Sequence, residues 1–403
     1  MRLGLRLALL ALAAVAWIVA AVLLWRSSVV PGGLHLSGLD PHRYFSDRQL
    51  ARSASFERFE RWDFVLAQLT LLTVLAVYAR FGGRFAQESA AGRIGTGMLL
   101  GMLGFGFVWL AQIPFGLADL WWERRHGVSR VGYVEWVFSD WSQLAGEFAF
   151  VCLALLIVMA LAGKLRDSWW LPGAAAFVGL AALFTFITPY LLGNLHPLAR
   201  PELARAAQRI AAREGVSGVP VRVQNVSGDT SAANAAAIGL GPSRRVVLWD
   251  TLLDGRFTDR QVRFVIAHEY GHQARRHLQK GIAWFALFAL PGTFLMARFT
   301  RRRGGMADPA VVPFSLLVLV VLQLVALPLQ NVVSRRIEAE ADWMGLRTTH
   351  DPTGDRRLMQ SFTQTSLAQP DPPGWSYVVL DSHPTIMQRI ALANAWEARE
   401  RRP

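Results

Sequence analysis

Two histidines that flank a glutamate form the most chemically suggestive stretch of the chain, which reads His268-Glu269-Tyr270-Gly271-His272. On an α-helix, residues four apart share a face, so His268 and His272 can present two ring nitrogens to one metal ion. Glu269 stands beside the first histidine, where a carboxylate can take a proton from a water at the metal. The spacing predicts metal-assisted hydrolysis, most commonly of peptide bonds.

The neighbouring residues favour buried metal ligands over a solvated helix face. Val262 and Ile266 give the expected helix an apolar side, and Asp259 lies in its first turn, where a negative charge suits the helix dipole. His277 follows His272 by five residues, which projects it to roughly the opposite face. We therefore expect His277 to be exposed and not to bind the metal.

A third protein ligand is expected, with the fourth position left to water. The best candidate lies in residues 334–343, where Glu338 and Asp342 are four apart and share a face. We predict that Glu338 is the third ligand and that Asp342, one turn later, holds a ligand histidine by its other ring nitrogen. Glu340 points away from Glu338 and is expected to be solvated. The alternative is an ordinary charged helix with Arg–Glu pairs.

These motifs resemble those of the M48 metallopeptidases, which include the Ste24-type CAAX prenyl endopeptidases and the HtpX-type quality-control proteases. Three further stretches are similar to the Ste24 branch: residues 114–127, 231–253 and 382–390. The long array of apolar runs before the metal helix also favours that branch. Two departures bear on substrate preference, since Ala235-Ala236 replaces the family's Ala-Tyr and Pro384-Thr385 replaces a frequent Pro-Pro.

The resemblance implies one Zn²⁺ per chain, with Glu269 as the catalytic base. It also implies that Asn234 and Ala235 hold an extended peptide against a strand edge, although a plain structural hairpin is the alternative. His383 would donate a hydrogen bond to the oxyanion, and Arg389 would orient the substrate or a carboxylate. The alternative for His383 is a helix start, with Ser382 as the cap and Pro384 in the first turn.

The composition indicates a membrane protein. Of 403 residues, 53% are hydrophobic, and 42 basic against 29 acidic residues give a formal charge of +13. Such a chain is expected to meet anionic lipid headgroups. Because no nucleic-acid module is present, we predict no nucleic-acid partner. The single cysteine, Cys152, excludes an intramolecular disulfide and a cysteine-based zinc site.

Apolar runs set the predicted fold class, because a membrane span needs about 20 residues. Seven charge-poor runs occur, at residues 7–25, 64–79, 95–118, 148–163, 169–192, 281–297 and 309–334. The first could be a cleaved signal after Arg2 and Arg6, but no convincing cleavage site follows near Trp25, so we expect a retained helix. The fold class is therefore mostly α, a polytopic bundle of about seven spans with a small α+β zincin-type metalloprotease domain.

The predicted division is a transmembrane region of about five spans at 1–193 and a peptidase domain at 194–403. A transmembrane hairpin at about 281–334 would separate the histidine pair from Glu338. Residues 201–214 read as an amphipathic helix, and residues 218–226, 235–239 and 245–249 read as strands. A small sheet beside the metal helix could bind a peptide at its edge.

We therefore predict an integral-membrane zinc metalloendopeptidase whose substrate is a peptide or protein, with a prenylated CAAX peptide implied by the Ste24 branch. The alternatives are an HtpX-like quality-control protease and a non-hydrolytic metal-binding transporter or scaffold. We expect the protein to lie in a membrane, which would be the cell membrane if the organism is a bacterium. Resemblance places the catalytic side in the cytosol, whereas basic residues in the short loops at 164–166 and 298–303 oppose that orientation under the positive-inside rule. Nothing in the sequence sets the oligomeric state.

Overall fold

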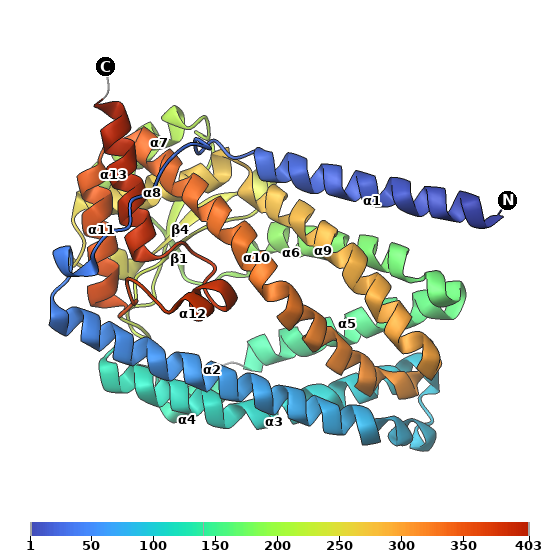
Figure 1. Cartoon of the computed structure of the whole chain (residues 1–403). Helices are drawn as coiled ribbons and strands as arrows, with labels where there is room; N and C mark the ends of the chain where they lie inside the picture. The colour runs from blue at the N-terminus through green and yellow to red at the C-terminus, as the bar shows by residue number, and fades with distance from the viewer. Residues whose placement is uncertain (1, 140, 402–403) are drawn as a thin grey trace.

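Long helices form a bundle that carries the peptidase elements at one end (Figure 1). The computed structural model describes residues 2–139 and 141–401, without the side chains of residues 2–10, 88, 139 and 141–143. The long helices are α1 Arg2–Arg26, α2 Asp47–Phe81, α3 Gly92–His126, α5 Trp141–Leu165, α6 Trp170–Leu191, α9 His277–Thr300 and α10 Val312–Thr349. The turns that join α2 to α3, α5 to α6 and α9 to α10 all lie at the other end of the bundle, called here the far end.

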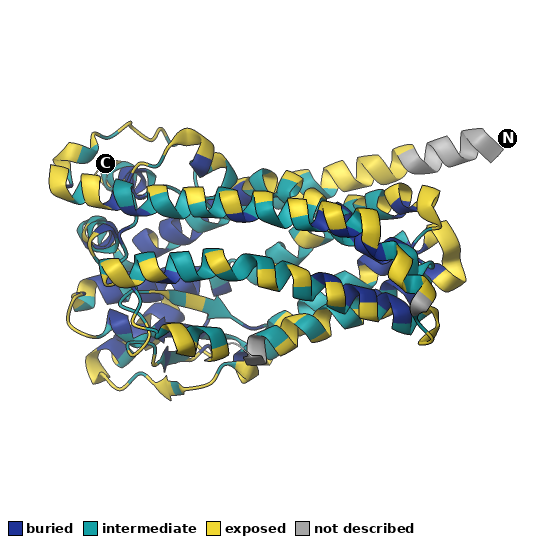
Figure 2. Cartoon of the chain, turned by 90° about the horizontal axis from the view of Figure 1, so that it is seen from below, coloured by how far each residue is buried: buried dark blue, intermediate teal, exposed yellow. Residues whose placement is uncertain are grey.

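Six helices among the described residues are long and apolar enough to cross a membrane. They are α2, α3, α5, α6, α9 and α10, and they correspond to the last six predicted apolar runs. The first run forms α1, whose described side chains begin at Ala11 and give a shorter apolar helix. Most described side chains of α1 are exposed (Figure 2). Trp17 Nε1 donates to Leu287 O of α9 at 2.9 Å. A polytopic, mostly helical fold is confirmed, with the predicted count of about seven as an approximation.

A small sheet follows α6. Its strands are β1 Leu195–Pro197, β2 Val221–Gln224, β3 Ala235–Ile238 and β4 Arg245–Trp249, in the order β1-β2-β4-β3. β2 and β4 are parallel, while β1 and β3 pair antiparallel at the two edges. The sequence predicted β2, β3 and β4 but not β1, which is too short to show a periodic pattern. Because β3 pairs only with β4, its other edge is open to a further strand.

The helix that carries the histidine pair, α8 Asp259–Ala274, is central to the peptidase core. Thr258 caps it in a reciprocal box with Gln261, and Asp259 lies in its first turn as predicted. Its buried residues join one apolar cluster with α7 Pro201–Arg213, α11 Pro352–Thr365 and α13 Ile386–Glu400. Figure 2 shows this end of the molecule as the most deeply buried part. The shorter helices α4 Tyr133–Ser139 and α12 Gly374–Val379 complete the fold.

Two glycines let α8 and α10 approach closely enough to bring their side chains to one point. A Cβ at Gly271 would lie 2.9 Å from Met344 Cβ and 3.4 Å from Ala341 O. A Cβ at Gly345 would lie 3.1 Å from Phe264 Cζ. Larger residues at these positions would therefore push the helices apart, and the acidic residues of α10 would move away from the histidines of α8.

Candidate active site

The three predicted metal ligands converge in the structure. His268 Nε2 and His272 Nε2 lie 3.1 Å apart. Glu338 Oε2 is 3.3 Å from His268 Nε2, and Glu338 Oε1 is 3.7 Å from His272 Nε2. In the part of the chain that the structure describes, these residues form the one group of three or more His, Cys, Asp or Glu side chains that could hold a metal ion.

The donor set fits a metal of the zinc type. Two imidazole nitrogens and one carboxylate are a common three-ligand catalytic zinc set, with the fourth position open. Glu338 Oε2 is buried and has no hydrogen-bond partner, which is a costly arrangement unless a cation is present. Donor chemistry and geometry thus support a metal site, whose ligand atoms all lie within 4.8 Å of one another.

Asp342 holds the first histidine from the side away from the site. Its Oδ1 lies 2.9 Å from His268 Nδ1, and the Asp342 side chain is fully buried. Burial opposes protonation of His268, but its hydrogen bond with Asp342 and the nearby carboxylate of Glu338 outweigh burial and raise the pKa of the imidazole to about 10. The predicted contact between Asp342 and a ligand histidine is therefore present.

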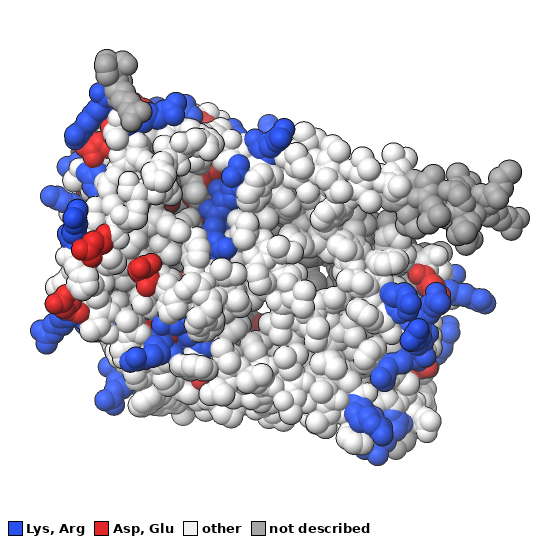
Figure 3. Space-filling model, viewed as in Figure 1, with Lys and Arg blue, Asp and Glu red and all other residues white. Residues whose placement is uncertain are grey.

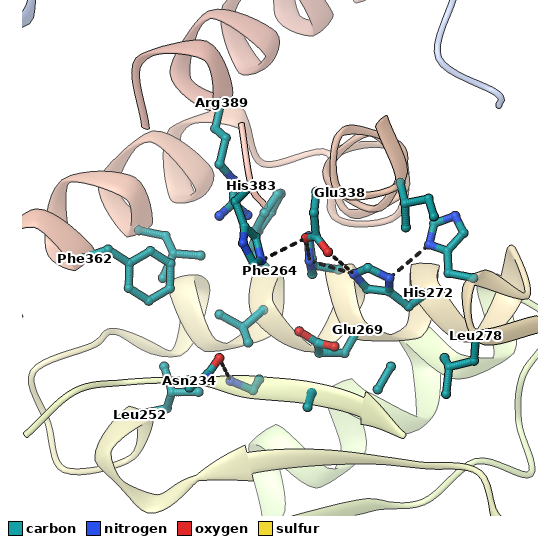
Figure 4. Close-up of a pocket in the computed structure, with 18 residues that line it drawn as sticks. Asn234, Leu252, Phe264, Glu269, His272, Leu278, Glu338, Phe362, His383 and Arg389 are labelled. Carbon is teal, nitrogen blue, oxygen red and sulfur yellow. Dashed lines mark hydrogen bonds and ion pairs between the residues drawn. The ribbon is translucent and has the colours of Figure 1, made fainter. Parts of the chain in front are cut away.

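Glu269 projects from α8 toward β3, on the side of the helix that faces the open strand edge (Figure 4). Glu269 is buried, and it lines a cavity of about 370 Å³ together with the three ligands. Because Glu269 and the ligands share this cavity, its carboxylate is placed to exchange a proton with a water beside the metal.

The same cavity brings in the residues proposed for substrate. Asn234, Ala235, Ala236 and Ala237 line one wall. Asn234 O accepts the Trp249 N–H at 3.0 Å, and Asn234 Oδ1 accepts the Ala235 N–H at 2.8 Å. The strand is thus fixed against β4, and its outer edge borders the cavity.

His383 and Arg389 face β3 from across the cavity (Figure 4). His383 Nε2 lies 3.4 Å from Glu338 Oε2, and its side chain is 60% exposed. Thr385 caps α13 in a box with Gln388, so Ser382 does not cap this helix. Arg389 bonds to Asp342 instead of pointing freely into the cavity, which supports the second of its two predicted roles, orientation of a carboxylate.

Two expectations about exposure were wrong. The side chains of His277 and Glu340 are only 2% and 3% exposed, and His277 Nε2 lies 3.2 Å from Glu340 Oε2. The helix ends at Ala274 and restarts at His277 after Arg276, which has a left-handed φ of 54°. A projection that assumed one unbroken helix therefore misplaced His277. In the sequence, the only sign that His277 and Glu340 are buried was that histidine and glutamate can pair with each other.

Comparison with known proteins agrees with this geometry. Residues 197–397 match the model for Peptidase family M48, which spans the sheet, the histidine pair and the acidic segment of α10. The chain belongs to peptidase family M48. The predicted resemblance to the Ste24-type members is thereby confirmed, with the relatives below.

Named relatives of this M48 chain include two proteases. The chain is 30% identical over 265 residues to "Uncharacterized metalloprotease YhfN" of Bacillus subtilis (strain 168), covering 62% of each chain. It is 24% identical over 301 residues to "CAAX prenyl protease 1" of Saccharomyces cerevisiae, covering 66% of this chain and 65% of that one. The match thus spans somewhat under two thirds of the length of these curated relatives.

The fold of this M48 chain also resembles a solved structure. The crystal structure of S. mikatae Ste24p has a TM-score of 0.69 and 19% sequence identity, and the match covers 95% of this chain and 97% of that chain. This likeness extends the similarity beyond the peptidase segment to the membrane bundle. It supports an integral, multi-pass membrane protein and confirms the predicted fold class.

Proposed function

We propose that this M48 protein is an integral-membrane zinc metalloendopeptidase with one zinc ion held by His268, His272 and Glu338. The observation that carries the proposal is the convergence of these ligand atoms beside Glu269, in a cavity bordered by an open strand edge. Zinc bound there would supply a Lewis acid and lower the pKa of water. The buried contact between Asp342 and His268 is of the kind that orients histidine ligands in metal sites.

The chain's own residues supply the remaining steps. The substrate's main chain lies along β3 as an added strand, with Asn234 and Ala235 at its start. Glu269 takes a proton from the attacking water and returns it to the leaving amine. His383 donates a hydrogen bond to the oxyanion that forms at the scissile carbonyl. Asp342 and Arg389 keep His268 in its ligand orientation.

The proposed substrate is a peptide or protein, and its finer class is a prenylated CAAX peptide. Support comes from the relatives named CAAX prenyl protease 1 and from the apolar bundle beside the cavity, which suits an amphipathic substrate. The small Ala235-Ala236 pair leaves room on the strand for bulkier substrate side chains.

The test is zinc content and cleavage of a farnesylated CAAX peptide by detergent-purified protein, beside Glu269→Gln. We expect about one zinc per chain in both proteins and a loss of about 10²–10⁴-fold in kcat for the variant. Glu202→Gln, at an exposed position of α7, is the matched control and should behave as the parent. Equal cleavage by Glu269→Gln and the parent would refute the proposal.

Two other outcomes assign the alternatives. Cleavage of unfolded membrane protein but not of the farnesylated peptide would favour HtpX-like quality control. Bound zinc with no chelator-sensitive cleavage of either substrate would favour a metal-binding transporter or scaffold.

We also propose that the catalytic end faces the cytosol, as the resemblance implies. Charge at the far end opposes this orientation, because Lys and Arg gather there, but Lys and Arg also lie at the catalytic end, so the bias is modest (Figure 3). The basic residues of its turns and flanking helix ends are Arg80, Arg84, Arg93, Lys164, Arg166, Arg298, Arg301, Arg302 and Arg303. The positive-inside rule would place that end in the cytosol, so accessibility labelling from each face is the deciding measurement.

A further inference from the structure

His272 has a buried partner of its own, separate from the Asp342–Arg389 pair that supports His268. His272 Nδ1 lies 3.0 Å from His277 Nδ1, and the His277 ring continues to Glu340 Oε2 at 3.2 Å. This contact is made by the ring nitrogen of His272 that is opposite to Nε2, the nitrogen nearer Glu338. The three groups thus form a row that leads away from the metal position, with His277 and Glu340 buried.

We infer that His277 is a positioning residue that fixes the ring of His272 for metal binding, with Glu340 as its anchor. The inference rests on the proposed zinc site. It concerns two residues to which no part of the proposed mechanism assigns a role.

Proton placement gives the row a direction. His272 directs Nε2 toward the metal position, so its proton must sit on Nδ1 when it is a neutral ligand. His272 Nδ1–H then donates to His277 Nδ1, which must be the unprotonated nitrogen of its ring. The remaining His277 proton is on Nε2, which faces the carboxylate of Glu340. This arrangement of protons holds His272 in the ligand tautomer, and it places the Nε2–H of His277 3.2 Å from Glu340 Oε2, without hydrogen-bond geometry.

Glu340 is held firmly enough to act as the anchor. Its Oε1 accepts from Arg275 Nε at 2.6 Å, and its Oε2 accepts from Lys280 Nζ at 3.2 Å. The Val29 N–H also donates to Oε1 at 3.3 Å, and Arg275 reaches Ser27 O at 2.8 Å. Arg275 at the end of α8, Lys280 of α9 and a backbone N–H of the connector after α1 thus keep this carboxylate ionised and fixed.

The location of His277 excludes direct metal binding. Its Nδ1 approaches the Nδ1 side of His272, which is the far side of that ring from the ligand nitrogen. A histidine with only a packing role could hydrogen-bond to any nearby polar group and would have no need to contact a metal ligand. Here the contact is to the ligand histidine itself, and α10 therefore carries the third ligand and both anchoring carboxylates at positions 338, 340 and 342.

The test measures zinc affinity of full-length protein in detergent by competition with a chelator, so that it does not depend on peptide cleavage. His277→Asn keeps a short polar side chain that can accept from His272 Nδ1–H, whereas His277→Leu keeps the bulk and removes the acceptor. We expect His277→Leu to bind zinc about 10–100-fold more weakly, with His277→Asn closer to the parent. Thermal melts of the metal-free proteins should differ little between the two variants.

Several results would overturn the inference. Zinc affinity of His277→Leu equal to that of the parent would do so, as would equal losses in the Asn and Leu variants. If His277→Leu does not fold, Glu340→Gln decides, because it leaves His277 in place and removes the charge that faces Nε2. We expect Glu340→Gln to weaken zinc severalfold, and an unchanged affinity would count against the inference. A parent protein that binds no zinc would instead overturn the proposed function.

Discussion

Arg389 donates to both carboxylate oxygens of Asp342, with Nε 2.9 Å from Oδ2 and Nη2 2.6 Å from Oδ1. The same carboxylate lies 2.9 Å from His268 Nδ1. Asp342 is fully buried, and burial would favour its neutral form if no cation were nearby. The Asp342 side chain beside the guanidinium stays ionised, and the contact raises the pKa of Arg389 despite its burial. An arginine from α13 therefore allows a charged aspartate to support a ligand on α8.

Removal of Arg389 should expose the cost of this burial. We expect Arg389→Met to destabilise the fold by about 3–5 kcal/mol, because it leaves a buried carboxylate uncompensated. The double variant Asp342→Asn/Arg389→Met should lose less than the sum of the two single variants. Chemical denaturation in detergent measures both, and Arg401→Met at the exposed end of α13 is the control. Additive losses would show that the pair is not coupled.

His383 should contribute to the chemical step and not to metal binding. We expect His383→Ala to lower kcat by about 10²–10³-fold, as for loss of one oxyanion donor, with zinc content unchanged. Steady-state kinetics and metal analysis on the same preparation measure both, with exposed His35→Ala as the control. A variant that loses zinc along with activity would instead assign His383 to support of Glu338, from which it lies 3.4 Å away.

The open edge of β3 should bind the substrate's main chain. Because Asn234 O bonds to the Trp249 N–H, alternate residues point away from β4, and Ala237 directs its N–H to the outer edge. Ala237→Pro removes that donor without removing a ladder bond, and proline is tolerated at such positions. We expect kcat/KM to fall about tenfold or more, at the cost of one hydrogen bond of about 1.5 kcal/mol.

Ala237→Ser is the matched control because it changes the side chain but keeps the N–H. The melting temperature of Ala237→Pro should stay near that of the parent. If kcat/KM is unchanged in a folded Ala237→Pro protein, substrate does not add to this strand as proposed.

Glu214 should make stability fall as pH rises. Burial raises the pKa of this carboxyl to about 7 in the fold from 4.5, and hydrogen bonding to Thr348 opposes the rise. The folded state therefore holds a proton that the unfolded chain releases above pH 4.5, so the stabilisation is complete below that pH and is lost as pH passes 7. The loss of folding free energy is at most about 3 kcal/mol, because a shift of one pKa unit corresponds to about 1.36 kcal/mol.

Thermal melts of the parent and Glu214→Gln between pH 4.5 and 8.5 measure this effect. The amide cannot ionise, so the advantage of the variant over the parent should grow with pH. A difference between the two proteins that is constant with pH would contradict the assignment of a raised pKa to Glu214.

The orientation of the chain can be measured with one cysteine at each end. In a Cys152→Ser background, Arg302→Cys marks the far end and exposed Arg209→Cys marks α7 at the catalytic end. With the site in the cytosol, an impermeant maleimide should label position 302 in intact cells and position 209 only after the membrane is opened. The reverse pattern would place the active site outside the cytosol, as the charge at the far end favours.

The sequence by itself determined what depends on local geometry. Residues four apart on a helix must share a face, so the spacing of His268 and His272, and of Glu338 and Asp342, was enough to predict both pairs. The apolar runs predicted the long helices, because the thickness of the membrane's hydrocarbon core fixes the length of a spanning helix.

Only the tertiary structure decided which distant residues meet. Arg389 reaches Asp342 because α13 packs on the peptidase core, and no periodicity relates positions 342 and 389. His277 was misplaced because a left-handed residue at Arg276 breaks the helix and redirects the ring toward His272. Glu340 was misplaced because Arg275 and Lys280, distant in sequence, pack on its carboxylate. Burial and ionic partners of a side chain are set by chain segments far away in sequence, which is why they could not be predicted from local pattern alone.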